Sequence, residues 1–213
     1  MIKLTQRLLA VARLVRENTS LADIGCDHGF LPVYLVLNGR INSAVASDIN
    51  EGPLASCRSL VKEYGLDEKI KCVLSDGLKN IRENEADDIA ICGMGGELIA
   101  SILSECEWVK NKDKHYIFNA MTHPEILRKY LCQNGFEIGE DIIVKEGKRY
   151  YSVFEAVYTG TVKEYAESYY YLGNITDFTH KEYFSHLLNY LENKTKSGFD
   201  FSKVIADIKE KIQ

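Results

Sequence analysis

The sequence has six cysteines but no Cys-x-x-Cys pair. The cysteines lie far apart, at positions 26, 57, 72, 92, 106 and 132. This spacing suggests neither a zinc site, whose ligands are usually close in sequence, nor a disulfide framework. Cys26, Cys72 and Cys92 fall in or beside segments expected to form core strands, where cysteine acts as a small apolar residue. We therefore expect a protein without a metal, located in the reducing cytoplasm.

Long hydrophobic runs and an excess of positive charge are absent as well. The longest apolar run near the N-terminus is Leu8 to Ala12, and Arg13 ends it. This run is too short for a signal peptide, and no later run is long enough for a membrane span, so we expect no membrane partner. The net charge is -5, so any contact with RNA must come from local basic patches. The 213 residues, 46% of them apolar, suffice for one sizeable core and a small appendage.

The segment Leu21–Pro32, LADIGCDHGFLP, has the pattern of a short apolar strand, a glycine turn and the start of a helix. Gly25 can adopt backbone angles closed to other residues, and Gly29 lets the next helix pack close to the strand. A helix that starts here directs free N–H groups and a partial positive charge toward a ligand. About 20 residues further on, a second strand ends at Asp48, which is the spacing at which nucleotide-binding folds hold ribose hydroxyls.

This glycine pattern differs from the one that binds dinucleotides. The pattern G-x-G-x-x-G needs a glycine at position 27, where this chain has Asp27. A pyrophosphate would meet an unfavourable carboxylate there, whereas an ammonium or sulfonium group would meet a favourable partner. The turn therefore favours S-adenosylmethionine over NAD. The alternative is a purely structural corner between the strand and the helix.

Strand and helix patterns alternate from residue 20 to residue 134, which predicts a parallel, doubly wound sheet. The expected strands are Leu21–Gly25, Ser43–Asp48, Ile70–Leu74, Asp87–Cys92 and His115–Asn119. The expected helices are Phe30–Asn38, Leu54–Tyr64, Glu97–Leu103 and Pro124–Asn134. Phe136–Lys145 and Arg149–Tyr158 then predict an antiparallel hairpin. We expect the Rossmann-like α/β fold of class I methyltransferases, with a mostly parallel seven-stranded sheet closed by this hairpin.

Amphipathic patterns flank this alternating region. Residues 2–17 predict a helix with Thr5 as its cap. Apolar residues from Phe184 to Leu191 and from Phe201 to Ile212 recur at helical spacing, so we expect an antiparallel helical pair. We accordingly divide the chain into a cofactor-binding domain, residues 1–160, and a helical domain, residues 161–213.

Basic side chains concentrate at both ends of this acidic chain. Near the N-terminus they lie on the polar side of the expected helix, and near the C-terminus they lie in the helical domain. Such patches favour contact with RNA, and the alternative is an ordinary solvated face. The candidate RNA-binding residues are Lys3, Arg7, Arg13, Arg16, Lys194 and Lys196.

Polar residues and glycines follow each expected strand. The carboxyl ends of parallel strands meet at one edge of the sheet, where ligands of such folds bind. The candidate cofactor-binding residues are Gly25, Asp27, His28, Asp48, Ile49, Asn50, Asp76, Gly77, Gly93 and Met94. Asp76 suits the adenine amino group, although Asp-Gly is also common in plain turns. The glycines from Gly93 to Gly96 either leave the main chain accessible beside the methyl donor or form a tight corner between a strand and a helix. A single histidine such as His28 more often has a structural role than a binding role.

With these residues the chain resembles the TrmK family of bacterial tRNA (adenine-22-N1)-methyltransferases. The resemblance runs nearly end to end, and the combination of D-I-G-x-D-H, N-E-G-P and G-M-G-G is specific to it. The matching stretches are LTQRLLAVA, LADIGCDHGFLPVYL, SDINEGPL, EYGLDEKI, LSDGL, ICGMGGELI, ILRKYLCQNGFEI and YYYLG. The resemblance implies a class I domain that binds S-adenosylmethionine and a coiled-coil-like helical pair that assists tRNA binding. It also implies methylation of N1 of adenine 22, in the D-loop region. Separately, we expect a monomer.

The chain departs from the family after the fifth expected strand. The family commonly shows Gln-Pro-Asn or a close variant there, and this chain has Asn119, Ala120 and Met121. N1 of adenine is a neutral nucleophile, so the enzyme must mainly align it with the sulfonium methyl group, without a strong base. We expect Asn119, Gly93 and Met94 to hold the base and Asp27 to assist electrostatically. The alternatives are a methyltransferase acting on another RNA base, a small molecule or a protein, and a module that binds without catalysis.

Overall fold

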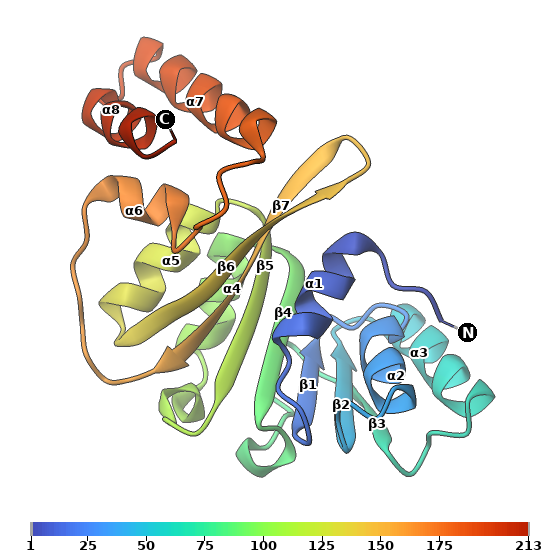
Figure 1. Cartoon of the computed structure of the whole chain (residues 1–213). Coiled ribbons are helices and arrows are strands. Elements are labelled where there is room, and N and C mark those ends of the chain that lie inside the picture. Colours follow the sequence, from blue (N-terminus) through green and yellow to red (C-terminus); the bar gives the residue numbers. More distant parts are fainter. Residues whose placement is uncertain (1, 213) are drawn as a thin grey trace.

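The computed structural model describes residues 2–212 and contains a seven-stranded sheet in the order β3-β2-β1-β4-β5-β7-β6 (Figure 1). Strands β1 to β5 are parallel, and β7 is antiparallel to both β5 and β6. The strands are β1 Ser20–Ile24, β2 Ser43–Asp48, β3 Ile70–Leu74, β4 Asp88–Gly95, β5 His115–Thr122, β6 Phe136–Glu146 and β7 Arg149–Tyr158. The predicted parallel sheet with a closing hairpin is confirmed.

Helices cover both faces of the sheet and form the C-terminal part (Figure 1). They are α1 Gln6–Leu14, α2 Phe30–Leu37, α3 Glu51–Glu63, α4 Gly96–Ser104, α5 Pro124–Gln133, α6 Glu167–Leu172, α7 Lys181–Lys196 and α8 Ser202–Lys211. One apolar core joins α1, α2 and α3 to the sheet, and a second joins α4 and α5 to its other face. Within residues 2–212, none of the helices has both the length and the apolar composition of a membrane span.

The first helix is shorter than its amphipathic pattern predicts. Thr5 caps it as expected, because its Oγ1 accepts a hydrogen bond from the backbone N–H of Leu8 at 3.4 Å. The helix ends at Leu14 because the backbone N–H of Arg16 donates to the Asp88 carboxylate at 2.7 Å and not to a helical carbonyl. This tertiary contact overrides the helical pattern.

Strands β4 and β5 extend beyond their predicted ends. Met94 pairs with Ala120 and Gly95 with Thr122, with register shifts after Cys92 and after Met94. Gly93 makes the first shift possible because its φ of +81° lies in the region that favours glycine. The irregular pairing carries Met94 beyond the regular part of the sheet.

The chain after residue 160 packs in two ways. The helix α6, which was not predicted, packs against α5, and Tyr170 joins the core on one face of the sheet. The helices α7 and α8 pack on each other and share an apolar cluster with Tyr171 and Ile175. The segment around α6 therefore contacts both the sheet domain and the terminal helices, so the packing does not divide sharply at residue 160.

A buried charge cluster lies where β4 and β5 begin, at the edge opposite the strand ends described below. His115 Nδ1 lies 3.2 Å from Asp88 Oδ2, and its Nε2 lies 3.0 Å from Glu155 Oε2. Arg16 also donates to Asp88 from Nε at 2.7 Å. Burial lowers the pKa of His115, but the hydrogen bonds to Asp88 and Glu155 outweigh burial and raise the pKa to about 9.

We expect this cluster to make the stability depend on pH. The pKa of folded His115 exceeds its ordinary value of 6.5, so its stabilisation is complete below pH 6.5 and is lost as the pH rises through about 9. The loss is on the order of 1–3 kcal/mol. Urea denaturation at about pH 6 and about pH 9.5 measures it. Between these two pH values, the free energy of unfolding of His115→Gln should fall less than that of the wild type. Equal falls would contradict the assignment of this pH dependence to His115.

Candidate active site

A cavity of about 540 Å³ opens at the carboxyl ends of β1 to β4. The turns after these strands converge on it because parallel strands point their carboxyl ends to the same edge. All the predicted cofactor-binding residues line it: Gly25, Asp27, His28, Asp48, Ile49, Asn50, Asp76, Gly77, Gly93 and Met94. We call this space the cofactor cavity.

Two glycines of the first turn adopt backbone angles in the region that favours glycine. Gly25 has a φ of +75° and Gly29 a φ of +72°. A Cβ atom on Gly25 would collide with the end of the Met94 side chain, and one on Gly29 would collide with the thiol of Cys57. The turn therefore brings main chain close to the cavity. The close contact at Gly29 is with Cys57 of α3, whereas the sequence predicted close packing of the helix against the strand.

Asp48 lies at the base of the cofactor cavity. It is 9% exposed, and its two carboxylate oxygens accept hydrogen bonds from the backbone N–H of Asn50 at 2.8 Å and of Asp27 at 3.3 Å. These bonds fix the carboxylate between two turns and leave further lone pairs for a ligand. Asp76 lies at the exposed rim, where Lys79 already donates to it at 2.5 Å.

Two charged residues that the sequence motifs do not assign to this site also line the cavity, Asp23 and Arg7. Asp23 is 5% exposed at the end of β1. Burial and the nearby Asp48 raise its pKa to about 7, against the opposing effect of Arg7. The position of Asp23, two residues before Gly25, was a usable signal. The position of Arg7 was not visible in the sequence, because it depends on how α1 lies over the sheet.

The raised pKa of Asp23 makes ligand binding sensitive to pH. Below about pH 7 the carboxyl group is protonated and would no longer attract the ammonium group of the expected cofactor, S-adenosylmethionine. We expect the affinity measured by calorimetry to fall by up to about tenfold per pH unit below this point. Asp23→Asn should bind weakly without this pH dependence. An unchanged pH dependence in Asp23→Asn would assign the titration to another group.

Asn119 does not line the cavity, contrary to its predicted contact with a target base. Its side chain is fully buried, its Nδ2 donates to the Ser152 carbonyl at 3.0 Å, and its Oδ1 accepts from Arg7 Nη1 at 3.0 Å. Asn119 lies within β5, so it belongs to the sheet and not to the turn before Pro124. Asn119 thus lies buried beneath the cavity and positions the Arg7 guanidinium through this hydrogen bond.

The other residues predicted to take part in catalysis differ in their surroundings. Gly93 and Met94 line the cavity at the irregular end of β4. The Asp27 side chain is 71% exposed, and its carboxylate lies 3.5 Å from His28 Nε2. Because a buried charge interacts more strongly than an exposed one, Asp23 is better placed than Asp27 for an electrostatic role.

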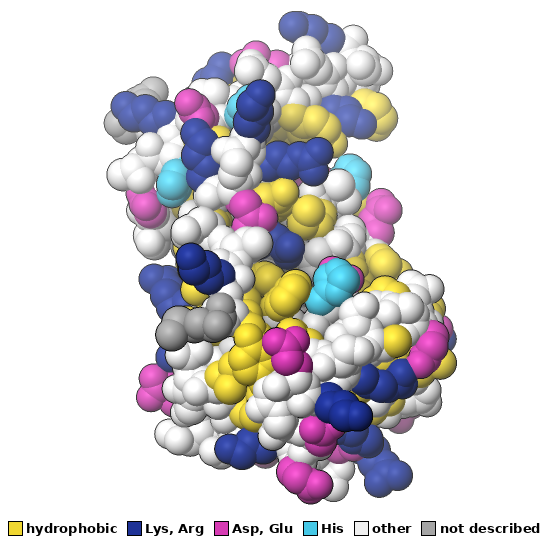
Figure 2. Space-filling model, turned by 90° about the vertical axis from the view of Figure 1, so that its right-hand side faces the viewer, with side chains coloured by type: hydrophobic (Ala, Val, Ile, Leu, Met, Phe, Trp, Pro, Cys, Tyr) yellow, Lys and Arg dark blue, Asp and Glu magenta, His cyan; other side chains and the backbone are white. Residues whose placement is uncertain are grey.

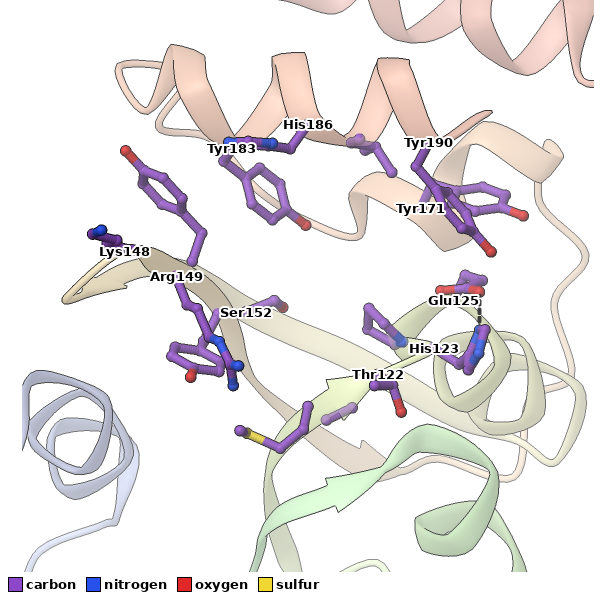
Figure 3. A pocket seen from close by; sticks show the side chains of 16 residues that line it. Thr122, His123, Glu125, Lys148, Arg149, Ser152, Tyr171, Tyr183, His186 and Tyr190 are labelled. Carbon is purple, nitrogen blue, oxygen red and sulfur yellow. Dashed lines mark hydrogen bonds and ion pairs between the residues drawn. The ribbon is translucent and has the colours of Figure 1, made fainter. Parts of the chain in front are cut away.

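A second cavity of about 730 Å³ adjoins the first. The end of β5, the hairpin β6–β7 and the helices α6 and α7 surround it (Figure 3). Met121 lines both cavities, and the Arg7 guanidinium lies 5.8 Å from the ring centre of Tyr151, which lines the second one. We call it the tyrosine cavity because five of its lining residues are tyrosines: Tyr150, Tyr151, Tyr171, Tyr183 and Tyr190.

The predicted RNA-binding residues are spread over different surfaces. Arg7 lies in the cofactor cavity, Arg13 pairs with Glu140, and Lys3 is exposed. Arg16 lies apart from them, because its guanidinium binds the buried Asp88 at the opposite edge of the sheet.

The two lysines lie on the C-terminal helices. Lys194 lies near the rings of Tyr190 and Phe199, and Lys196 is exposed. Figure 2 shows Lys and Arg side chains over this part of the molecule and hydrophobic side chains in the hollow beneath it.

Residues 4–154 match a family model described as a methyltransferase domain. Over 212 residues the chain is 31% identical to a putative tRNA methyltransferase of Mycoplasma pneumoniae, covering 94% of this chain and 96% of that protein. Over 155 residues it is 36% identical to the tRNA (adenine(22)-N(1))-methyltransferase of Bacillus subtilis. This second match covers 73% of the chain and 65% of the relative.

The fold is similar to solved structures over the full length of the chain. A putative tRNA (m1A22) methyltransferase of Streptococcus pneumoniae, in complex with S-adenosyl-L-methionine, superposes with a TM-score of 0.87. The two chains are 30% identical, and the superposition covers 100% of both. The similarity thus includes the C-terminal helices as well as the sheet.

Proposed function

The chain belongs to the TrmK family of tRNA (adenine-22-N1)-methyltransferases, and from this premise we propose that it methylates N1 of adenine 22 in tRNA with S-adenosylmethionine. One observation carries the proposal. A cavity rich in carboxylates at the strand ends adjoins an aromatic cavity, and Met121 lines both. The first suits the cofactor and the second faces the RNA. A single chain contains both, so we also propose a monomer that acts on tRNA in the cytoplasm.

The charges in the cofactor cavity fit this cofactor. Four carboxylates line it, from Asp23, Asp27, Asp48 and Asp76, together with the guanidinium of Arg7. The cofactor has a ribose, an adenine amino group, an ammonium group, a sulfonium and one carboxylate. Asp48 would hold the ribose hydroxyls, Asp76 the adenine amino group, Asp23 the ammonium group and Arg7 the carboxylate. When bound, the cofactor supplies an electrophilic methyl group.

The chain's own residues would align the target base and exclude water. Gly93 bears no side chain, so its backbone is open to the base beside Met94. Met94, Met121 and Leu98 give this side of the cavity an apolar wall. N1 of adenine is neutral and needs no strong base, so positioning suffices. A base in folded tRNA must first leave its stack, which costs a few kcal/mol. Contacts of the helical part with the RNA would compensate for this cost.

Arg7 is expected to recognise the carboxylate of the cofactor. Within residues 2–212 no carboxylate lies within ion-pair distance of its guanidinium, so the charge remains available to a ligand. Arg7→Met should weaken the binding of S-adenosylmethionine about 10- to 100-fold, the range for one charge-assisted hydrogen bond. Calorimetry should show no such loss for decarboxylated S-adenosylmethionine. Arg13→Gln, on the same helix but outside the cavity, is the matched control. An equal loss for both ligands in Arg7→Met would refute this role.

The proposed reaction has a direct test. Unmodified tRNA is incubated with the protein and a labelled cofactor, and the nucleosides are analysed by mass spectrometry. We expect 1-methyladenosine, which disappears when adenine 22 is replaced by another base. Methylation that survives this replacement would indicate another RNA base as the target. No label in tRNA, despite measurable cofactor binding, would favour a small molecule or a protein as the substrate.

A further inference from the structure

We propose that the tyrosine cavity binds an unpaired nucleotide of the RNA that flanks the methylated adenine. This inference rests on the proposed function, since it names a second part of the same substrate. The cavity lies outside the site assigned to the cofactor, and its volume of about 730 Å³ is within the range of small-molecule sites. Its composition, its charges and its position each point to a nucleotide.

Aromatic rings enter the cavity from opposite sides. Tyr171, Tyr183 and Tyr190 reach it from α6 and α7 (Figure 3). Tyr150 and Tyr151 belong to β7 and also line it. Figure 3 shows Tyr171 and Tyr190 together above His123 and Glu125. Nucleobases stack on tyrosine rings whatever their identity, because every base has a flat π face. Tyr190 is 40% exposed, which leaves ring surface for such a contact.

Charged side chains lie at two opposite ends of the tyrosine cavity. Lys148 and Arg149 lie at the turn of the hairpin, both exposed, and within residues 2–212 neither has an ion-pair partner. They suit a phosphate group. At the other end, His123 Nδ1 lies 3.0 Å from Glu125 Oε1, so the lining carboxylate already has a partner (Figure 3). This pair offers hydrogen-bonding groups to the edge of a base.

The position of the cavity selects a neighbour of the target base. Met121 lines both cavities, so a nucleotide in one lies beside the contents of the other. His123 has a φ of 52°, in the left-handed region, and a Cβ atom on Gly96 would collide with its carbonyl oxygen. The absence of a side chain on Gly96 therefore lets the main chain at His123 approach α4 closely, and His123 lines the cavity.

The test measures binding of an unmodified tRNA transcript to the full-length protein saturated with S-adenosylhomocysteine. Tyr190→Ala should weaken binding about 5- to 150-fold, the range for loss of one stacked base, whereas Tyr190→Phe should stay within about threefold. Arg149→Gln should lower the slope of log affinity against log salt by about one. Phe199→Ala removes the other ring near Lys194 but lies outside the cavity, so it is the control and should weaken binding far less than Tyr190→Ala.

A thermodynamic cycle then identifies the nucleotide. Transcripts that each lack one base beside adenine 22 are measured with the wild type and with Tyr190→Ala. At one position, removal of the base should weaken tRNA binding by the wild type but should not weaken binding by Tyr190→Ala any further. Additive losses at every position, or equal binding by Tyr190→Ala and the wild type, would overturn the proposal. So would binding of adenosine monophosphate at Tyr190 with unchanged tRNA affinity, because the occupant would then be a free nucleotide.

These outcomes are separate from those of the proposed function. If the wild type forms no 1-methyladenosine while the cycle is non-additive, the methylation proposal fails and the nucleotide site stands. If methylation occurs while all losses are additive, the nucleotide site fails and the methylation stands.

Discussion

Arg128→Met is expected to destabilise the fold by about 3–5 kcal/mol, because it leaves a buried carboxylate without its partner. Arg128 is fully buried, and its Nη2 donates to Asp141 Oδ2 at 2.7 Å and to Ser152 Oγ at 2.7 Å. Its Nη1 donates to the carbonyls of Tyr170 and Tyr171 in α6. Burial raises the pKa of Asp141, and Arg128 opposes this effect. The guanidinium therefore joins α5, the hairpin and α6 at one buried point.

Chemical denaturation of the full-length protein measures the loss. The double variant Arg128→Met/Asp141→Leu should recover part of it, since replacing both partners removes the unpaired charge. Lys129→Met is the control, because its ion pair with Glu167 is exposed and contributes little. A loss below about 1 kcal/mol in Arg128→Met would mean that water or rearrangement satisfies Asp141.

The same contacts bear on the domain division. A boundary after residue 160 separates Arg128 from the carbonyls of Tyr170 and Tyr171, to which it donates. We propose that residues 161–175 fold with the sheet domain and that α7 and α8 form the part that assists tRNA binding. The isolated β-bridge between Asp141 and Ile175 supports this division.

Asp48→Ala is expected to weaken S-adenosylhomocysteine binding by at least about a hundredfold. Two hydrogen bonds from ribose hydroxyls to a carboxylate contribute roughly 1.5–3 kcal/mol each. The geometry supports a strong effect, since the backbone N–H groups of Asn50 and Asp27 hold the carboxylate at the floor of the cavity.

Calorimetry with purified protein checks this expectation, with thermal denaturation as the test of folding. Glu51→Ala is the matched control, because this acid lies three residues away, pairs with Arg58 at the surface and does not line the cavity. Unchanged affinity in Asp48→Ala, with the control also unchanged, would place the ribose elsewhere.

The cofactor cavity was predictable because its parts are local in sequence. Gly25 and Gly29 lie in one short turn, and Asp48 follows at the end of the next strand. Alternation of strands and helices implies a parallel sheet, and a parallel sheet gathers the turns after its strands at one edge. Motif spacing and a general rule of topology therefore sufficed to bring these residues together.

Tertiary packing alone decided the roles of Arg7, Asn119 and Arg16. Arg7 and Asn119 are 112 residues apart and meet because α1 crosses the sheet beside β5. Arg16, on the same helical pattern as Arg7, reaches the opposite edge because the helix ends at Leu14. A periodic pattern shows which face of a helix is polar, but the orientation of the packed helix decides what each polar side chain meets.

The tyrosine cavity also depended on the three-dimensional arrangement. Its rings come from β7, α6 and α7, and its hydrogen-bonding pair comes from the start of α5. Each tyrosine is compatible with a core or a surface position when taken alone in the sequence. Arg128 binds α6 through a buried hydrogen bond to the Tyr170 carbonyl, and α6 shares an apolar cluster with α7. These contacts place the tyrosines around one cavity. Contacts between distant segments have no local pattern, so the sequence by itself determined the cofactor cavity and the structure decided the second one.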